Sequence, residues 1–273
     1  MKRILAILCA IALTTLLFAG CGAEANTEKI TSPDMFEGRI IAVQYDTTAD
    51  YAVTDLVDAG ANIEVRRYDK VTQCFDDLKL GRVDAVYVDS VVAAFYTKDD
   101  DAFERTWLDD VPEPLGICLA KGADGLAAAV EAALDHINFT GRMNEIALEH
   151  FGDDFTANLR VLAELPEIPT EFATKKEGVL MVGCEPGYPP MEYTTEDGLT
   201  FIGFDIDVGK AIAEVLGLEW ELVPTAWDGI FEDLERGSYD CIISSVSITA
   251  PRQERFILTA PYVANALCIV TAA

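Results

Sequence analysis

Val71-Thr72-Gln73-Cys74-Phe75-Asp76-Asp77-Leu78-Lys79-Leu80-Gly81-Arg82-Val83-Asp84-Ala85-Val86-Tyr87-Val88 is the stretch of sequence that best indicates the fold. Apolar residues recur at helical spacing up to Leu80, and Gly81 then offers the left-handed conformation that often ends a helix. The apolar run at 85–88 predicts a buried strand directly afterwards. The stretch therefore predicts an α/β fold with a largely parallel sheet.

The same alternation extends in both directions along the chain. Before this stretch, the pattern predicts strands at 39–43 and 63–65 and a helix at 50–58. After it, we expect helices at 90–97, 123–136 and 141–151 and a strand at 115–119. Residues 152–176 carry two prolines and little apolar periodicity, which predicts a connector. Beyond it, strands are predicted at 179–182, 219–223, 241–243 and 266–270, and helices at 205–216 and 229–236.

A short internal echo suggests two lobes of similar architecture. Residues 78–86 and 234–242 both contain a helix end, a glycine, an aspartate and the start of an apolar strand. One such echo is weak evidence of duplication. It nevertheless suits two α/β lobes built in the same way.

The composition excludes several classes of protein. The 273 residues carry 20 lysines and arginines against 47 aspartates and glutamates, a net charge of −27, which disfavours binding to nucleic acid. The two histidines, fourteen residues apart, give poor support for a histidine metal site or a catalytic triad. The seven cysteines include no C-x-x-C spacing, so we expect neither a metal nor a cofactor. The five cysteines after residue 21 fit small buried hydrophobes, with one disulfide left open.

The N-terminus resembles an export signal. Lys2 and Arg3 precede an apolar run from residue 4 to 19, which predicts a signal peptide over residues 1–20. The run ends Leu17-Phe18-Ala19-Gly20-Cys21, which resembles a bacterial lipobox and implies lipidation of Cys21. Residues 21–29 would then form a tether. A plain signal peptide with an incidental cysteine is the alternative.

An ordered series of motifs after residue 179 resembles the front half of the family 3 solute-binding proteins, which serve ABC importers of polar amino acids. Residues 30–151 resemble the back half of the same family. In residues 30–151, the matching residues begin with 38–44 and Thr47-Thr48 and continue with 81–85 and Asp89. They end with 115–117 and with a pair of helices that closes at 150–152. In the segment after residue 179, the matching residues are 184–191, 203–207, 227–229, 237–240, 245–252 and 261–262.

The two halves therefore stand in reversed order, which implies a circular permutant of one bilobed, Venus-flytrap binding protein of periplasmic-binding-protein type II. Lobe B would cover 30–118 and lobe A 119–273, including the connector 152–176. Strands 115–119 and 266–270 would cross the hinge side by side, leaving one covalent crossing. A truncated tandem of two binding proteins is the alternative.

The resemblance also implies the residues that bind ligand. Arg252 would bind the ligand carboxylate through its planar fork, and Asp89 would bind the ammonium group. Asp205 and Asp207 are expected to cap the following helix rather than to bind ligand. Hydroxyls, backbone amides, two aromatic rings and one carboxylate would complete the site, supplied by Ser245, Ser247, Thr249, Thr47, Thr48, Tyr188, Trp227 and Glu185.

The resemblance implies a receptor that captures a free polar or charged L-amino acid and delivers it to the transmembrane subunits of an ABC importer. The receptor would be a monomer, lipid-anchored outside the cytoplasm, with no catalytic residue. One alternative is an enzyme of the cyclohexadienyl dehydratase type, for which Glu185 is the candidate general acid. Another is a sensory ligand-binding module, which would require a separate membrane partner.

Overall fold

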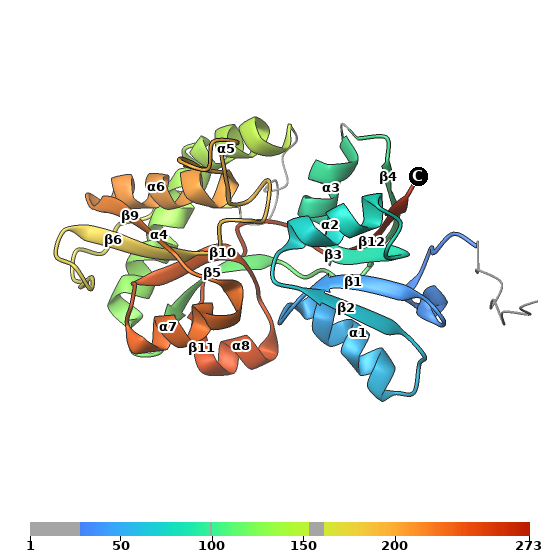
Figure 1. Cartoon of the computed structure of the whole chain (residues 1–273). Coiled ribbons are helices and arrows are strands. Elements are labelled where there is room, and N and C mark those ends of the chain that lie inside the picture. Colours follow the sequence, from blue (N-terminus) through green and yellow to red (C-terminus); the bar gives the residue numbers. More distant parts are fainter. Residues whose placement is uncertain (1–27, 99, 153–160) are drawn as a thin grey trace, which may run out of the picture.

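The computed structural model describes residues 28–98, 100–152 and 161–273, which form two groups of elements side by side (Figure 1). Each group is built on a five-stranded sheet. We call the group with β1–β4 and β12 lobe B and the group with the other large sheet lobe A. The predictions for residues 1–27 lie outside the described residues.

Lobe B holds a mixed sheet in the order β2-β1-β3-β12-β4. β1 is parallel to β2 and β3, whereas β12 is antiparallel to both β3 and β4. The elements are η1 (Pro33–Phe36), β1 (Ile40–Gln44), α1 (Thr48–Asp58), β2 (Glu64–Tyr68), α2 (Val71–Lys79), β3 (Ala85–Asp89), α3 (Ser90–Lys98), β4 (Phe103–Leu108) and β12 (Leu267–Ala272).

Lobe A holds a second mixed sheet in the order β11-β5-β10-β6-β9, together with a small β7–β8 hairpin. β6 is parallel to β9 and β10, and β5 is antiparallel to β10 and β11. The elements are β5 (Leu115–Ala120), α4 (Asp124–Phe139), α5 (Arg142–Phe151), β6 (Val179–Cys184), β7 (Tyr193–Thr194), β8 (Phe201–Ile202), α6 (Phe204–Leu216), β9 (Glu219–Pro224), η2 (Trp227–Gly229), α7 (Ile230–Arg236), β10 (Cys241–Ser247), α8 (Ala250–Arg255) and β11 (Phe256–Leu258).

The central strands are buried on both faces, which explains their unbroken apolar runs. In β10, Ile242 packs with the α7 side of the sheet, while Cys241 and Ile243 pack on the α6 side. In β3, Tyr87 packs on the α1 side and Val88 on the α2 and α3 side. The alternating directions of strand side chains thus fill two core layers in each lobe.

The similar segments 78–86 and 234–242 have the same structural arrangement in the two lobes. Asp84 donates its N–H to the carbonyl of Ile40 and accepts the N–H of Ile40 at its Oδ2. Asp240 makes the same pair of bonds with Met181. Gly81 and Gly237, which precede these aspartates, have φ of 66° and 80°, values that favour glycine. Each aspartate therefore ties the segment after a helix to a strand of its own lobe, β1 in lobe B and β6 in lobe A.

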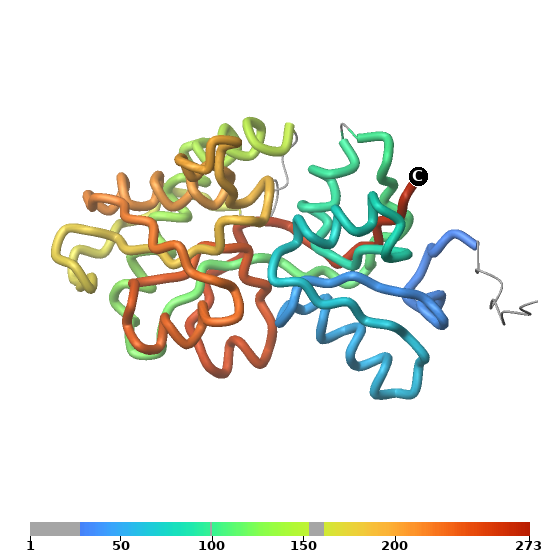
Figure 2. The backbone as a smooth tube through the Cα atoms, in the orientation of Figure 1, coloured from blue at the N-terminus to red at the C-terminus, as the bar shows by residue number. Residues whose placement is uncertain are grey.

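The chain passes between the lobes through residues 109–114 and 259–266, seen in Figure 2 as the green and dark red stretches. Val263 pairs with Leu115, and Asn265 accepts from the N–H of Glu113 at 2.8 Å. The predicted pairing of 266–270 with 115–119 is wrong, because β12 enters the lobe B sheet and β5 the lobe A sheet.

The predicted assignments of residues 115–118 to lobe B and of 266–270 to lobe A are corrected accordingly. The expectation of a single covalent crossing fails for the same reason. β12 is apolar on both faces and occupies an interior position of the lobe B sheet, where it buries more surface than at a hinge.

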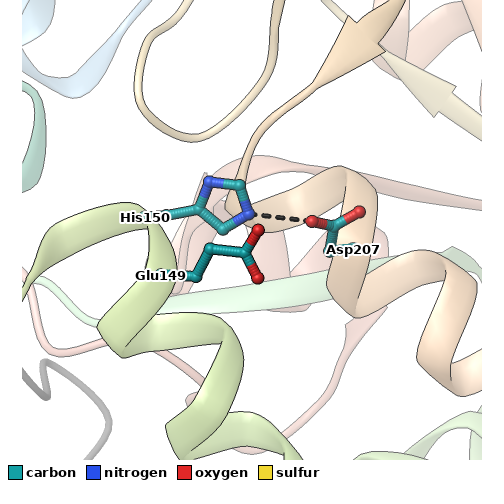
Figure 3. A group of neighbouring side chains, drawn as sticks. All are labelled: Glu149, His150 and Asp207. Atoms are coloured by element: carbon teal, nitrogen blue, oxygen red, sulfur yellow. Dashed lines mark hydrogen bonds and ion pairs between the residues drawn. The ribbon is translucent and has the colours of Figure 1, made fainter.

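His150 on α5 and Asp207 on α6 link two helices of lobe A (Figure 3). His150 Nε2 lies 2.9 Å from Asp207 Oδ2, and Lys210 Nζ lies 2.9 Å from the other carboxylate oxygen. The bond from His150 is the largest cause that lowers the pKa of Asp207, to about 2. Asp207 therefore serves the fold, as expected, but through a contact between helices rather than a cap.

We expect Asp207→Asn to lower the free energy of unfolding by roughly 1–2 kcal/mol at pH 7. A carboxyl whose folded-state pKa lies below its usual value stabilises the fold above that usual value, and the stabilisation disappears as the pH falls through about 2. Urea unfolding between pH 7 and pH 3 should show the wild-type advantage shrinking with acid. Glu214→Gln, on the exposed side of α6, is the control. An advantage independent of pH would contradict this assignment.

Candidate functional site

A small polar cavity lies between the lobes, where the carboxyl ends of strands from both sheets meet. We call it the inner cavity. Three acidic residues and one arginine face it, together with hydroxyl, amide and aromatic groups. Its lining consists of Gln44, Thr47, Thr48, Asp89, Glu185, Tyr188, Glu192, Trp227, Ser244, Ser245, Ser247 and Arg252.

Asp89 ends strand β3 and is held by groups from three parts of the chain. Tyr188 Oη donates to Asp89 Oδ2 at 2.5 Å, and the amide of Asn265 donates to Oδ1. Burial, and then the nearby Glu113 carboxylate, raise the pKa of Asp89 to about 6, although both hydrogen bonds and Arg252 oppose the rise. Above that pH the carboxylate is an anion at the cavity wall.

Asn265 explains why Asp89 is not used as a helix cap. The backbone N–H and the hydroxyl of Ser90, the first residue of α3, both donate to Asn265 Oδ1 at 3.0 Å. Asn265 belongs to the segment that passes between the lobes, so it reaches this helix start only in the folded protein. The carboxylate of Asp89 is thereby left to face the cavity.

Arg252 lies in the short helix α8 and carries the charge opposite to that of Asp89. One of its guanidinium nitrogens, Nη1, donates to the carbonyl of Ser247 at 3.1 Å, and the guanidinium lies 5.5 Å from the Trp227 ring centre and 5.0 Å from that of Phe231. Burial lowers the pKa of Arg252. Among the described residues no carboxylate forms an ion pair with it within 4.0 Å.

Three hydrogen bonds join the lobes around the inner cavity. Besides the bond from Tyr188 to Asp89, Gln44 Nε2 donates to Glu185 Oε2 at 3.0 Å, and Trp227 Nε1 donates to the carbonyl of Asp46 at 3.0 Å. Glu185 is 4 % exposed, and burial raises its pKa while the bond from Gln44 opposes the rise. Its buried carboxylate would be stabilised by a further hydrogen-bond donor or a cation.

The N-terminus of α1 faces the same cavity, as predicted for Thr47 and Thr48. Thr47 is the N-cap residue and accepts the N–H of Asp50, and Thr48 is the first residue of the helix. Thr48 Oγ1 donates to Glu113 Oε1 at 2.7 Å. Asp46 has φ of 62°, so an aspartate occupies a left-handed position that suits glycine.

The serines in the second half of β10, where the strand pairing is irregular, are positioned by buried carboxylates. The N–H of Ser245, whose φ is 50°, donates to Asp205 Oδ2 at 2.8 Å, and Tyr262 Oη donates to Asp205 Oδ1 at 2.8 Å. Ser244 Oγ donates to Glu192 Oε1 at 2.6 Å. The expectation that Asp205 caps α6 is wrong, because its carboxylate supports this part of β10 instead.

All the predicted ligand-binding residues line the inner cavity except Thr249. Thr249 is the N-cap of α8, and its hydroxyl accepts the N–H of Arg252. Gln44, Ser244 and Glu192 also line the cavity and were missed. Gln44 and Ser244 could have been found, because Gln44 follows a predicted strand and Ser244 adjoins the serine motif.

One group outside the cavity has the composition of a metal site. Glu149, His150 and Asp207 each place a ligand atom within 4.8 Å of the others (Figure 3). The ion pair of Asp207 with Lys210 puts a cation beside this group, which disfavours a bound metal. We therefore interpret the group as a contact between α5 and α6.

The two sheets, the paired crossings and the charged cavity define a bilobed α/β protein with a polar cavity between its lobes. Residues 180–273 match the profile of the bacterial extracellular solute-binding proteins, family 3. These residues make up about a third of the chain, and over them the sequence is similar to that family. Across the described residues, no helix combines the length and the apolar character needed to cross a membrane.

Individual relatives match over similar stretches. The L-cystine-binding protein TcyJ of Escherichia coli K12 is 35% identical over 88 residues, 32% of this chain and 33% of the relative. The cyclohexadienyl dehydratase of Pseudomonas aeruginosa is 33% identical over 96 residues, 35% of each chain. The arginine-bound form of domain 1 from TmArgBP is 32% identical, covering 35% of this chain and 80% of that one, with a TM-score of 0.31. The chain spans about a third of the length of the curated relatives it matches.

Proposed function

We propose that the protein is an extracytoplasmic receptor that captures a polar amino acid between its lobes and delivers it to an ABC importer. One observation carries this proposal. Arg252 and Asp89 line the same cavity from different lobes, and they form no ion pair with each other within 4.0 Å. A free α-amino acid carries a carboxylate and an ammonium group, each of which needs a partner when water is removed. Arg252 and Asp89 offer one partner to each.

The remaining polar groups fit the rest of an amino acid. The N–H groups at the start of α1 and the hydroxyl of Ser247 are suited to the ligand carboxylate. Tyr188 and Trp227 provide ring surface beside it. Glu185 faces the side-chain end and favours a cationic or amide side chain, since its carboxylate forms no ion pair within 4.0 Å among the described residues. The names of the relatives that bind cystine and arginine are consistent with a polar ligand.

We expect the protein to bind an L-amino acid at least tenfold more tightly than the 2-hydroxy acid with the same side chain. Without the ammonium group, the buried carboxylate of Asp89 would lose water and gain no partner. A thermal-shift screen of the twenty amino acids identifies the ligand, and calorimetry then compares it with its hydroxy analogue.

Asp89→Asn is the matched variant, because it removes the charge and keeps the shape. This variant should bind the amino acid more weakly, so that its affinities for the amino acid and for the hydroxy acid differ less than those of the wild-type protein. Equal affinity of the wild-type protein for both compounds would remove Asp89 from the ammonium site. If no amino acid bound, the proposed function itself would fail.

An enzyme of the cyclohexadienyl dehydratase type is the second candidate. The buried Glu185, whose pKa is raised by burial, is the candidate general acid at the cavity wall. A relative of this activity matches about a third of the chain. Turnover of prephenate or arogenate that is lost in Glu185→Gln would favour the enzyme, whereas binding without turnover would favour the receptor.

We also propose that the chain is a circular permutant, lipidated at Cys21 and monomeric, that works with the transmembrane subunits of an importer. The two lobes would be its domains, with residues 152–176 as the connector. Permutation is supported by the way residues 30–108, which precede the family-matched segment in the sequence, form one lobe together with the last strand of that segment, residues 267–272. A truncated tandem would instead bring together halves of two different modules. Intact mass after membrane extraction tests the lipid, and light scattering tests the monomer.

A further inference from the structure

A second cavity between the lobes adjoins the inner cavity, and we call it the outer cavity. The two cavities share Glu185 and Trp227 as a common wall. The outer cavity lies at the carboxyl ends of β1, β2, β6 and β9. Its lining consists of Tyr45, Asp69, Lys70, Glu185, Pro186, Pro224, Thr225, Ala226, Trp227 and Asp228.

The free space is distributed very unevenly between the two cavities. The inner cavity has a free volume of about 20 Å³ and the outer cavity about 470 Å³. A single ordered water needs roughly 10–15 Å³ on such a scale. With the lobes in this position, the inner cavity has room for little more than one water, whereas the outer cavity has room for a head group. A ligand with one end between Arg252 and Asp89 would therefore find free space for its far end beyond Glu185 and Trp227, in the outer cavity.

The outer cavity has charges of both signs. Lys70 supplies the cation and Asp69 and Asp228 supply anions, all three of them exposed. Within the described part of the chain, none of the three forms an ion pair within 4.0 Å. Lys70 precedes α2, and its side chain reaches across to lobe A: its Cδ lies 3.3 Å from the position that a Cβ on Gly187 would take. The absence of a side chain at Gly187 keeps this path open.

We propose that the ligand is an amino acid whose side chain ends in a second amino-carboxylate head group. This inference rests on the proposed function, since the first head group would occupy the site between Arg252 and Asp89. The second would lie in the outer cavity, with its carboxylate toward Lys70 and its ammonium toward Asp69 and Asp228. At each end of the ligand, each charged group would then meet a protein side chain of opposite charge. This complementarity favours such ligands over shorter amino acids.

Calorimetry with two matched ligand pairs tests the proposal. LL-2,6-diaminopimelate differs from L-lysine by one carboxylate, and L-cystathionine differs from L-ethionine by the whole second head group. In at least one pair, the two-headed compound should bind the wild-type protein at least tenfold more tightly. Lys70→Met keeps the stem and removes the charge, so it should reduce that ratio to within about twofold. Its effect on the single-headed compound should be small.

Lys79→Met is the control, because Lys79 lies at the other end of α2 and is paired with Asp100 outside the cavity. It should leave the ratio unchanged. Equal affinities within both pairs, or a preference that Lys70→Met does not alter, would overturn the inference. Binding of lysine that depends on Arg252 would then still support the proposed function. If none of the four compounds or the twenty amino acids bound, both proposals would fall.

Discussion

Arg252→Ala should weaken ligand binding by more than a hundredfold, about 3 kcal/mol or more. The ligand carboxylate would remain in a closed polar cavity without its cation, and an unpaired charge there costs more than the lost contact. Arg252→Lys should give an intermediate loss, because an ammonium cannot donate two parallel bonds in one plane. The packing of the guanidinium near Trp227 and Phe231 fixes the direction of this fork.

Arg255→Ala provides the matched control for this measurement. Arg255 belongs to the same short helix but pairs with Glu232 and Glu235 outside the cavity. Calorimetry should therefore give the Arg255→Ala variant nearly the wild-type affinity. Unchanged affinity in Arg252→Ala would remove Arg252 from the site and leave the charge pairing without support.

Ending the chain after Ala266 should lower the free energy of unfolding by roughly 5 kcal/mol or more. The deletion removes β12 from between β3 and β4 and takes away Leu267, Cys268, Ile269 and Val270, each 7% exposed or less. It also leaves unpaired hydrogen-bonding groups along β3 and β4. Lobe B should then lose its cooperative unfolding transition in urea.

A shorter truncation separates this effect from the loss of a tail. Ala272 and Ala273 are exposed, so ending the chain after Thr271 should change stability very little. Amide exchange in the intact protein should show β12 protected as strongly as β3. Rapid exchange along β12, with or without ligand, would mean that the strand is not an integral part of the lobe B sheet.

Much of the site was accessible from the sequence because it is built at the ends of elements. Asp89 ends a buried strand, Thr47 and Thr48 lie at the start of a helix, and Arg252 lies in the first turn of another. Local patterns place such residues at the edge of a sheet, where ligands commonly bind. The role of each residue came from the family resemblance rather than from its spacing.

The alternation of apolar runs and amphipathic stretches was sufficient to predict an α/β fold. It depends on the periods of helices and strands, which the sequence carries locally. Strand β4 (Phe103–Leu108) was missed because it lies at the edge of the lobe B sheet, where only Phe103 is buried and charges interrupt the pattern. An edge strand needs little apolar surface and leaves a weak signal.

The tertiary structure alone decided which segments meet. Residues 267–272 could have paired at the hinge or within a sheet, since an apolar strand fits both, and burial on both faces placed them between β3 and β4. Asn265 caps α3 across 175 residues of sequence and so leaves Asp89 to the cavity, and Gln44 reaches Glu185 across 141 residues. These contacts depend on the packing of both lobes, so no local pattern could reveal them, whereas the elements they join were already determined by the sequence around them.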